Sequence, residues 1–220
     1  MAILSTSIAR KFAMALSGLF LVLFLAQHLT INLSSVFDPE TFNSWSEFMG
    51  TNIAVQFILQ PILAFAVVFH FIMGFILEAR NRNARKISYK SYKGNRNSTW
   101  VSRNMLISGL VILAFLGLHF YDFWFPEMNI KYIQGGPLDP TRYYTEMVHK
   151  FADPVRTALY CISFVLLALH LWHGFSSTFQ SIGWNNKYSK GLRGFTQFYA
   201  VVVPLGFIFI ALYLHFNGSF

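Results

Sequence analysis

Charged residues are scarce in this sequence. Asp, Glu, Lys and Arg make up 12% of its 220 residues, whereas they account for about a quarter of a typical soluble domain. Hydrophobic residues make up 55%, and 25 positions are phenylalanine. This composition excludes an ordinary water-soluble domain and predicts a protein whose main solvent is the lipid bilayer.

Cysteine is nearly absent as well. Cys161 is the only one in the sequence, so the chain can form no internal disulfide and cannot supply the thiolates of an iron–sulfur cluster. The sequence also lacks Cys-x-x-Cys-His, which excludes a haem attached through thioether bonds. Any iron–sulfur cluster that works with this chain must therefore belong to a partner protein.

Five long stretches contain no charged residue at all. They lie near residues 12–35, 53–77, 104–121, 157–178 and 195–217, and a helix needs about 20 apolar residues to cross the hydrocarbon core. The sequence therefore predicts an all-α membrane protein in which residues 1–220 form a single domain with five transmembrane helices. We interpret the first stretch as a permanent helix and not as a signal peptide, because its apolar run is long and no clear cleavage site follows it.

The basic residues predict the orientation of these helices. Residues 1–11, 78–103 and 187–193 carry 13 of the 17 Lys and Arg and only one acidic residue, whereas residues 38–52 and 122–156 carry the other four basic and eight acidic residues. Since Lys and Arg are retained on the cytoplasmic side, we expect a cytoplasmic N-terminus and a C-terminus outside. The net charge of +8 is thereby explained by topology and by contact with lipid headgroups or an acidic partner, and no nucleic-acid partner is expected.

Two short patterns each occur twice inside the apolar stretches. A Ser-Gly-Leu triplet begins 11 residues before a histidine in the first stretch, at Ser17 and His28, and again in the third, at Ser108 and His119. The second pattern, His-x-x-x-Gly, occurs once in the second stretch and once in the fourth. This order indicates a duplicated helical hairpin followed by a fifth helix that carries neither pattern.

The predicted topology sorts four histidines into two levels of the membrane. His28 and His119 follow the last inner basic residue by 17 and 16 positions, or about 25 Å of helix, and so belong to the outer half. The second and fourth helices run inward, which places His70 and His170 in the inner half. Each level therefore receives two histidines, from two helices of the same direction.

Two histidines that face each other across a helix bundle can supply both axial ligands of a haem iron. The sequence therefore predicts two b-type haems in a bundle formed by the first four helices, with the iron of the outer one held by His28 and His119 and that of the inner one by His70 and His170. Because three helical turns separate each serine from its histidine, Ser17 and Ser108 share the ligand face at the level of the inner pair. Their hydroxyls are candidates to bond a haem propionate or a histidine N–H.

Other interpretations of the histidines compete with this one. A single histidine in a membrane helix often serves only packing, and a zinc or proton-relay site would need carboxylates, which the five predicted stretches lack. His173 lies one turn from His170 and is a possible competitor as ligand. The His-x-x-x-Gly register favours His170, because only this residue matches His70.

Four segments carry a resemblance to a known family: "QHLTIN" (27–32), "HFIMG" (70–74), "GLHFYDFW" (117–124) and "HLWHGFSS" (170–177). In them the sequence resembles the cytochrome b membrane-anchor subunit of succinate:quinone oxidoreductase (complex II), in the single-subunit, five-helix, dihaem class that also occurs in fumarate reductases. The resemblance extends over essentially the whole chain. It implies that His70 and His170 bind the haem proximal to the catalytic subunits, and that His28 and His119 bind the distal one.

The resemblance also implies partners and a place in metabolism. A flavoprotein with FAD would oxidise succinate, as in the tricarboxylic acid cycle, and an iron–sulfur protein would dock on the cytoplasmic face of this chain in the bacterial cytoplasmic membrane. Electrons would then pass through the two haems to a quinone, for which menaquinone is the expectation in this class. The chain would be the quinone-reactive subunit of the complex, with no dehydrogenase active site of its own.

The segment "FNSWSEF" (42–48) supplies candidates for the quinone site. It belongs to a short amphipathic outer helix predicted over residues 37–50, where Glu47 is a candidate proton donor and Trp45 a candidate contact of the quinone ring. A solvated surface acid is the competing interpretation of Glu47. At the level of the whole protein, the alternatives are the dihaem cytochrome b of a membrane hydrogenase or formate dehydrogenase, and a haem-free helical anchor or transporter.

Overall fold

The computed structural model describes residues 6–84, 105–135, 139–184 and 189–218, and the described part is helical without any strand. Its elements are α1 (Ser7–Phe37), α2 (Pro39–Thr51), η1 (Val55–Leu59), α3 (Gln60–Ala84), α6 (Met105–His119), η2 (Phe120–Trp124), α7 (Phe125–Asn129), η3 (Ile130–Gln134), α8 (Arg142–Phe151), α9 (Pro154–Ser181) and α10 (Ser189–Asn217). Those labelled η are single π-helical turns. Much of the basic segment 78–103, on which the predicted orientation depends, lies outside the described residues.

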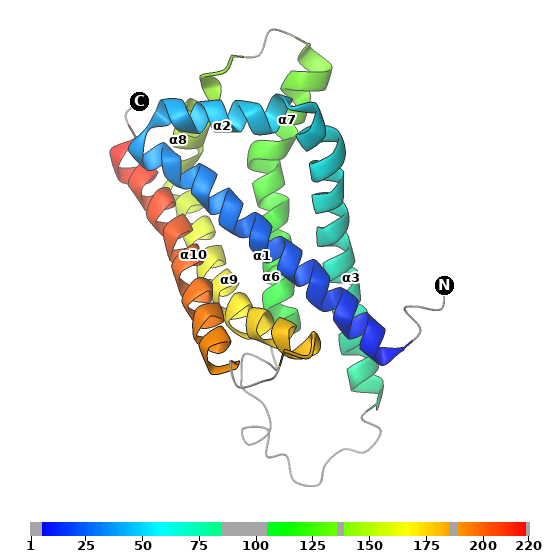
Figure 1. Cartoon of the computed structure of the whole chain (residues 1–220). Coiled ribbons are helices and arrows are strands. Elements are labelled where there is room, and N and C mark those ends of the chain that lie inside the picture. Colours follow the sequence, from blue (N-terminus) through cyan, green and yellow to red (C-terminus); the bar gives the residue numbers. More distant parts are fainter. Residues whose placement is uncertain (1–5, 85–104, 136–138, 185–188, 219–220) are drawn as a thin grey trace.

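Five helical spans in the described part are long and apolar enough to cross a membrane, which confirms the predicted number and makes the chain a multi-pass membrane protein. They are Ser7–Phe37, Val55–Asn81, Met105–Gln134, Pro154–Ser181 and Ser189–Asn217. In Figure 1, α3, α6, α9 and α10 run along the length of the molecule and α1 crosses them diagonally. Helix α2 lies across one end, which we call the α2 end; α10 ends there, and α1 begins toward the opposite, far end (Figure 1).

The amphipathic helix predicted over residues 37–50 is confirmed as α2. Asp38 ends α1, where its N–H donates to the carbonyl of Ser34 (2.8 Å), and it also caps α2. Its carboxylate accepts hydrogen bonds from the Thr41 hydroxyl (2.5 Å) and from the Glu40 N–H (3.1 Å). These bonds, that from Thr41 above all, lower the pKa of Asp38. The sharp corner between α1 and α2 follows from this double cap, with Pro39 at the first helical position.

The third span is longer than predicted. The sequence predicts a helix that ends near residue 121 and an irregular segment over 122–156, but the helical path from α6 continues to Gln134, and α8 then fills residues 142–151. The prediction was wrong because the charged residues beyond Tyr121 find partners inside the fold: Asp122 pairs with Arg156 of α9, and Glu127 with Lys131 one turn further on.

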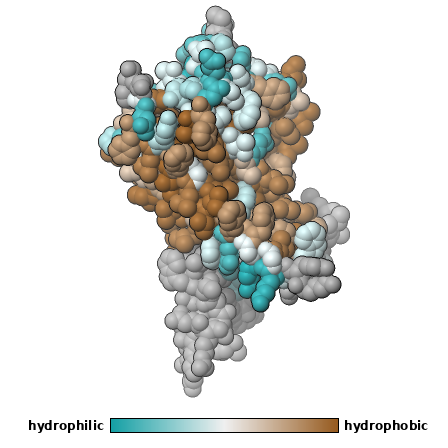
Figure 2. Space-filling view, turned by 60° about the vertical axis from the view of Figure 1, so that its left-hand side comes forward, coloured by the Kyte–Doolittle hydropathy of each residue, from teal (hydrophilic) through white to brown (hydrophobic). Residues whose placement is uncertain are grey.

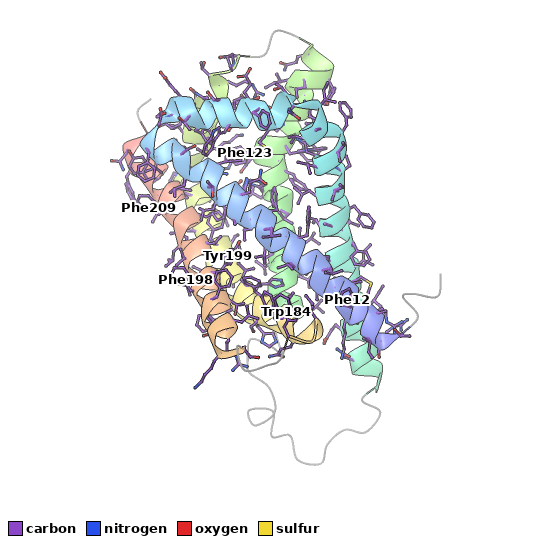
Figure 3. The ribbon with its side chains drawn as sticks, in the orientation of Figure 1. Phe12, Phe123, Trp184, Phe198, Tyr199 and Phe209 are labelled. Carbon is purple, nitrogen blue, oxygen red and sulfur yellow. The ribbon has the colours of Figure 1, made fainter. Side chains whose placement is uncertain are left out.

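The fifth helix is part of the bundle core. Buried residues of α10, among them Ala200, Phe207 and Leu214, join the two hydrophobic clusters that also contain residues of α9. Tyr199, labelled in Figure 3, donates its hydroxyl from α10 to the carbonyl of Val22 in α1 (2.5 Å). Large apolar side chains point outward instead, and Figure 2 shows a broad hydrophobic band across the middle of the face in view, with hydrophilic residues above and below it. This is the surface that a bilayer requires.

Candidate cofactor-binding site

The fold brings the four predicted histidines together as two pairs. The ring centroids of His28 and His119 lie 5.8 Å apart, and those of His70 and His170 lie 6.5 Å apart. The first pair, which we call the α2-side pair, lies roughly 15 Å along α1 from the start of α2. The second, the far-side pair, lies nearer the opposite end. The pairing by level that the sequence predicts is the pairing of rings in the structure.

The far-side pair is held by the two serines of the repeated pattern. The Ser17 hydroxyl lies 3.1 Å from Nδ1 of His70, and the Ser108 hydroxyl lies 3.2 Å from Nδ1 of His170. Both contacts join helices, α1 to α3 and α6 to α9. The sequence leaves open whether these serines bond a haem or a histidine, and in the structure their partners are the histidines. Ring contacts place His170, and not His173, opposite His70.

The repeated glycines allow the close approach of these helices. A Cβ on Gly18 would lie 3.2 Å from Cε1 of His70, whereas one on Gly109 would lie 3.8 Å from Cε1 of His170. The former is tighter than an ordinary van der Waals contact and the latter is ordinary. A side chain at position 18 would therefore require the His70 ring to shift by a few tenths of an ångström, and the two halves of the site are similar without being identical.

The α2-side pair has an aromatic environment. His28 stacks on Phe24 (ring centroids 5.4 Å apart) and also contacts Phe207 of α10 at 5.6 Å. His119 packs against Phe123 (5.3 Å), which is labelled inside the bundle in Figure 3, and against Tyr160 of α9 (6.3 Å). The contribution of α10 was not predicted, because this helix carries neither repeated pattern.

The polar surroundings of the α2-side pair differ from those of the far-side pair. Nδ1 of His119 is buried without a hydrogen-bond partner. Nδ1 of His28 lies 3.4 Å from the amide nitrogen of Asn32, which donates its better hydrogen bond to the His28 carbonyl (2.8 Å). No serine therefore takes the place that Ser17 and Ser108 have in the other pair.

The spacing of both pairs fits a metal held between two imidazoles. Two imidazole–metal bonds of about 2 Å, with each ring centre roughly 1 Å behind its nitrogen, place the ring centres about 6 Å apart. The observed separations of 5.8 and 6.5 Å lie on either side of this value. Among the described residues, no group of three or more His, Cys, Asp or Glu is placed to hold a metal ion. Each pair by itself therefore offers two imidazoles at a separation compatible with one metal ion between them, and this separation also lies within the range of ordinary aromatic contacts.

A buried polar triad next to His119 was missed by the sequence reasoning. The carboxylate of Asp122 is fully buried; it accepts a hydrogen bond from the Tyr160 hydroxyl (2.9 Å) and lies 3.2 Å from the Arg156 guanidinium. The prediction that the membrane spans contain no carboxylate was therefore wrong. The aspartate in "GLHFYDFW", three residues after a ligand candidate on the same helix, was the available signal.

An apolar groove of about 440 Å³ lies between α1 and α2, beside His28. Trp45, Phe48 and Met49 line it from α2, and Gln27, Thr30 and Ile31 line it from α1. Trp45, the residue predicted to contact a quinone ring, therefore lines an apolar groove. Glu47 is a half-buried residue of α2 and does not line this groove.

A network of charged side chains closes the α2 end. Glu127 forms ion pairs with Lys131 and with Arg142 of α8, and Arg142 also pairs with Glu146 (2.8 Å). Burial by itself would lower the pKa of Arg142, but its bonds to Glu127 and Glu146 raise it. Lys131 in addition donates to the carbonyl of Gly50, at the end of α2. The network ties α2, the end of the third span and α8 together.

Comparison with protein-family models, with curated proteins and with solved structures found no significant match. The described geometry is that of a five-span membrane protein with two facing histidine pairs at two levels.

Proposed function

We propose that this chain is a dihaem cytochrome b that anchors and serves a succinate dehydrogenase or fumarate reductase in the bacterial cytoplasmic membrane. The observation that carries the proposal is the existence of two histidine pairs, each with the ring separation that a bis-imidazole metal needs, on helices of one bundle. The resemblance of the four histidine segments to the membrane-anchor family supports the same function.

In this proposal the iron ligands are His28 and His119 at the α2 side and His70 and His170 at the far side. Haem iron with two imidazole ligands takes up and releases one electron without binding a substrate. The chain holds the two groups at different levels, packs aromatic rings around the α2-side pair, and leaves no thiol or carboxylate among the ligands. Those are the properties of an electron conductor and not of an oxygen-binding site.

The partners follow from the same assignment. An iron–sulfur protein would dock at the far end, and a flavoprotein bound to it would carry FAD and the succinate site. Electrons would enter at the far-side pair and leave from the α2-side pair toward a quinone. This places the far end in the cytoplasm, as the charge asymmetry of the sequence predicts.

The groove between α1 and α2 is our proposed quinone site. It is apolar, borders the turn of α1 that carries His28, and offers the indole of Trp45 for ring contact. Gln27 makes only a weak contact with the sulfur of Met49 (3.7 Å), so its amide is available to a quinone oxygen. Glu47, on the same helix as Trp45, is the nearest proposed source of protons, acting from outside the groove.

The decisive experiment is a reduced-minus-oxidised absorption spectrum of the purified chain, with haem quantified per protein. We expect two b-type haems in the wild type. His70→Ala and His170→Ala should each remove one haem and leave the other, whereas His173→Ala should retain both. A wild-type protein without a b-type absorption band would refute the proposed function. Co-purification of a flavoprotein that oxidises succinate distinguishes it from a hydrogenase or formate dehydrogenase subunit.

A further inference from the structure

The hydroxyls of Ser17 and Ser108 each have two partners. Ser17 donates to the carbonyl of Met14 (2.9 Å) and Ser108 to that of Met105 (2.9 Å). A hydroxyl has a single proton, and here that proton is used in the bond to the main chain. The contact of each serine oxygen with a histidine Nδ1 at 3.1 and 3.2 Å must then be one in which the serine accepts and the imidazole donates.

This assignment decides the tautomer of both rings. A neutral imidazole carries one N–H, so a proton on Nδ1 of His70 and His170 leaves Nε2 with its lone pair free. We infer that Ser17 and Ser108 are positioning residues that hold the two far-side histidines in the Nδ1–H tautomer, with Nε2 available to the haem iron. The part of the inference that concerns haem iron rests on the proposed function. The part that concerns the tautomer rests only on the hydrogen bonds of the two serines.

Only the far-side pair has a serine that accepts a hydrogen bond from each histidine. At the α2-side pair, the buried Nδ1 of His119 has no partner, and Nδ1 of His28 faces an amide nitrogen, which is a donor. The far-side arrangement recurs instead in both halves of the repeat, each time with a serine three residues after a methionine carbonyl. Both halves of the repeat keep the same three-part arrangement, in which a methionine carbonyl, a serine hydroxyl and a histidine Nδ1 are bonded in series.

When the serine accepts a hydrogen bond from Nδ1, the histidine becomes a stronger ligand for a metal through Nε2. A hydrogen bond from the second ring nitrogen raises the basicity of the ligating one, and loss of such a partner typically costs 10–100-fold in metal affinity. Ferric iron gains more than ferrous iron from a basic ligand, so removal of the hydroxyl should favour the reduced state. A tenfold change in that preference equals 59 mV for a one-electron couple.

The test is a redox titration of serine variants in the haem-loaded protein. Ser17→Ala and Ser108→Ala should each raise the midpoint potential of one haem, by about 59 mV for a tenfold effect, and leave the other unchanged. Ser17→Thr, which keeps the hydroxyl, should restore the wild-type potential. Ser163→Ala is the matched control, because Ser163 bonds the carbonyl of Leu159 within its own helix (2.8 Å).

A second readout needs neither haem nor a variant. Nitrogen-15 shifts of the histidine rings in the apoprotein should show the Nδ1–H tautomer for His70 and His170. If the wild type binds two haems but the Ser17 and Ser108 variants match Ser163→Ala in both potentials, the positioning role is wrong. The opposite tautomer in the apoprotein would also overturn it. If the wild type contains no haem, the proposed function is refuted, and the serines then have no role toward haem iron. This result can be told apart from unchanged potentials and from the opposite tautomer.

Discussion

Replacement of Tyr160 by phenylalanine should destabilise the protein through the loss of one oxygen atom. The hydroxyl donates to Oδ2 of Asp122 at 2.9 Å, Tyr160 is 2% exposed, and the carboxylate is fully buried. A hydrogen bond to a charged group contributes about 1.5–3 kcal/mol net, and in Tyr160→Phe no water reaches the carboxylate to replace it. Interhelical hydrogen bonds measured in membranes reach about 1.7 kcal/mol, so we expect a loss of about 1.5 kcal/mol, roughly tenfold in the unfolding equilibrium.

The assay is thermal or denaturant unfolding in detergent, followed by circular dichroism. Tyr121→Phe is the control, because the side chain of Tyr121 is 64% exposed and lies next to Asp122 in the chain. In a double-mutant cycle, Tyr160→Phe should cost much less when Asp122 is already Asn, since the charged acceptor is then absent. Equal losses for Tyr160→Phe and Tyr121→Phe, or additive losses in the cycle, would contradict the reasoning.

The remaining predictions concern the repeat and the groove. Gly18→Ala should lower the thermal stability and the haem content more than Gly109→Ala. The Cβ added at position 18 would lie 3.2 Å from the His70 ring, whereas the one added at position 109 would lie at an ordinary contact distance of 3.8 Å from the His170 ring. Equal effects of the two substitutions would refute this asymmetry. Trp45→Ala should raise the KM for a soluble quinone by about tenfold with both haems retained. Trp184→Ala, at the opposite end of the bundle, should leave the KM unchanged. The same KM in both variants would show that the quinone binds elsewhere.

Hydropathy is a local property, and it predicted most of the architecture. A run of about 20 apolar residues can only be stable in a bilayer as a helix, so five spans followed from the sequence without tertiary information. The start of α2 is also set locally, because Asp38 caps the helix and Pro39 occupies its first position. The levels of the four histidines followed from the predicted topology and from helix rise, which is why both pairs could be proposed before any contact was known.

The end of the third span was decided by contacts between helices. Asp122 looks like the first residue of a loop when hydropathy is the only criterion, but Tyr160 and Arg156 lie 38 and 34 residues further along the chain and meet it only in the folded bundle. The cost of burying a carboxylate depends on such partners. No pattern within one helix can show whether they are present.

The sequence by itself determined that this is a five-span membrane protein with four histidines at two levels, because hydrophobic length and helix rise need no knowledge of neighbours. Only the tertiary structure decided that Ser17 and Ser108 bond histidines, that α10 contacts His28 through Phe207, and that Trp45 faces a groove on α1. Each of these depends on the rotation of one helix about its axis relative to another. Side-chain packing between helices sets that rotation, and a linear sequence records only which side chains are available for it.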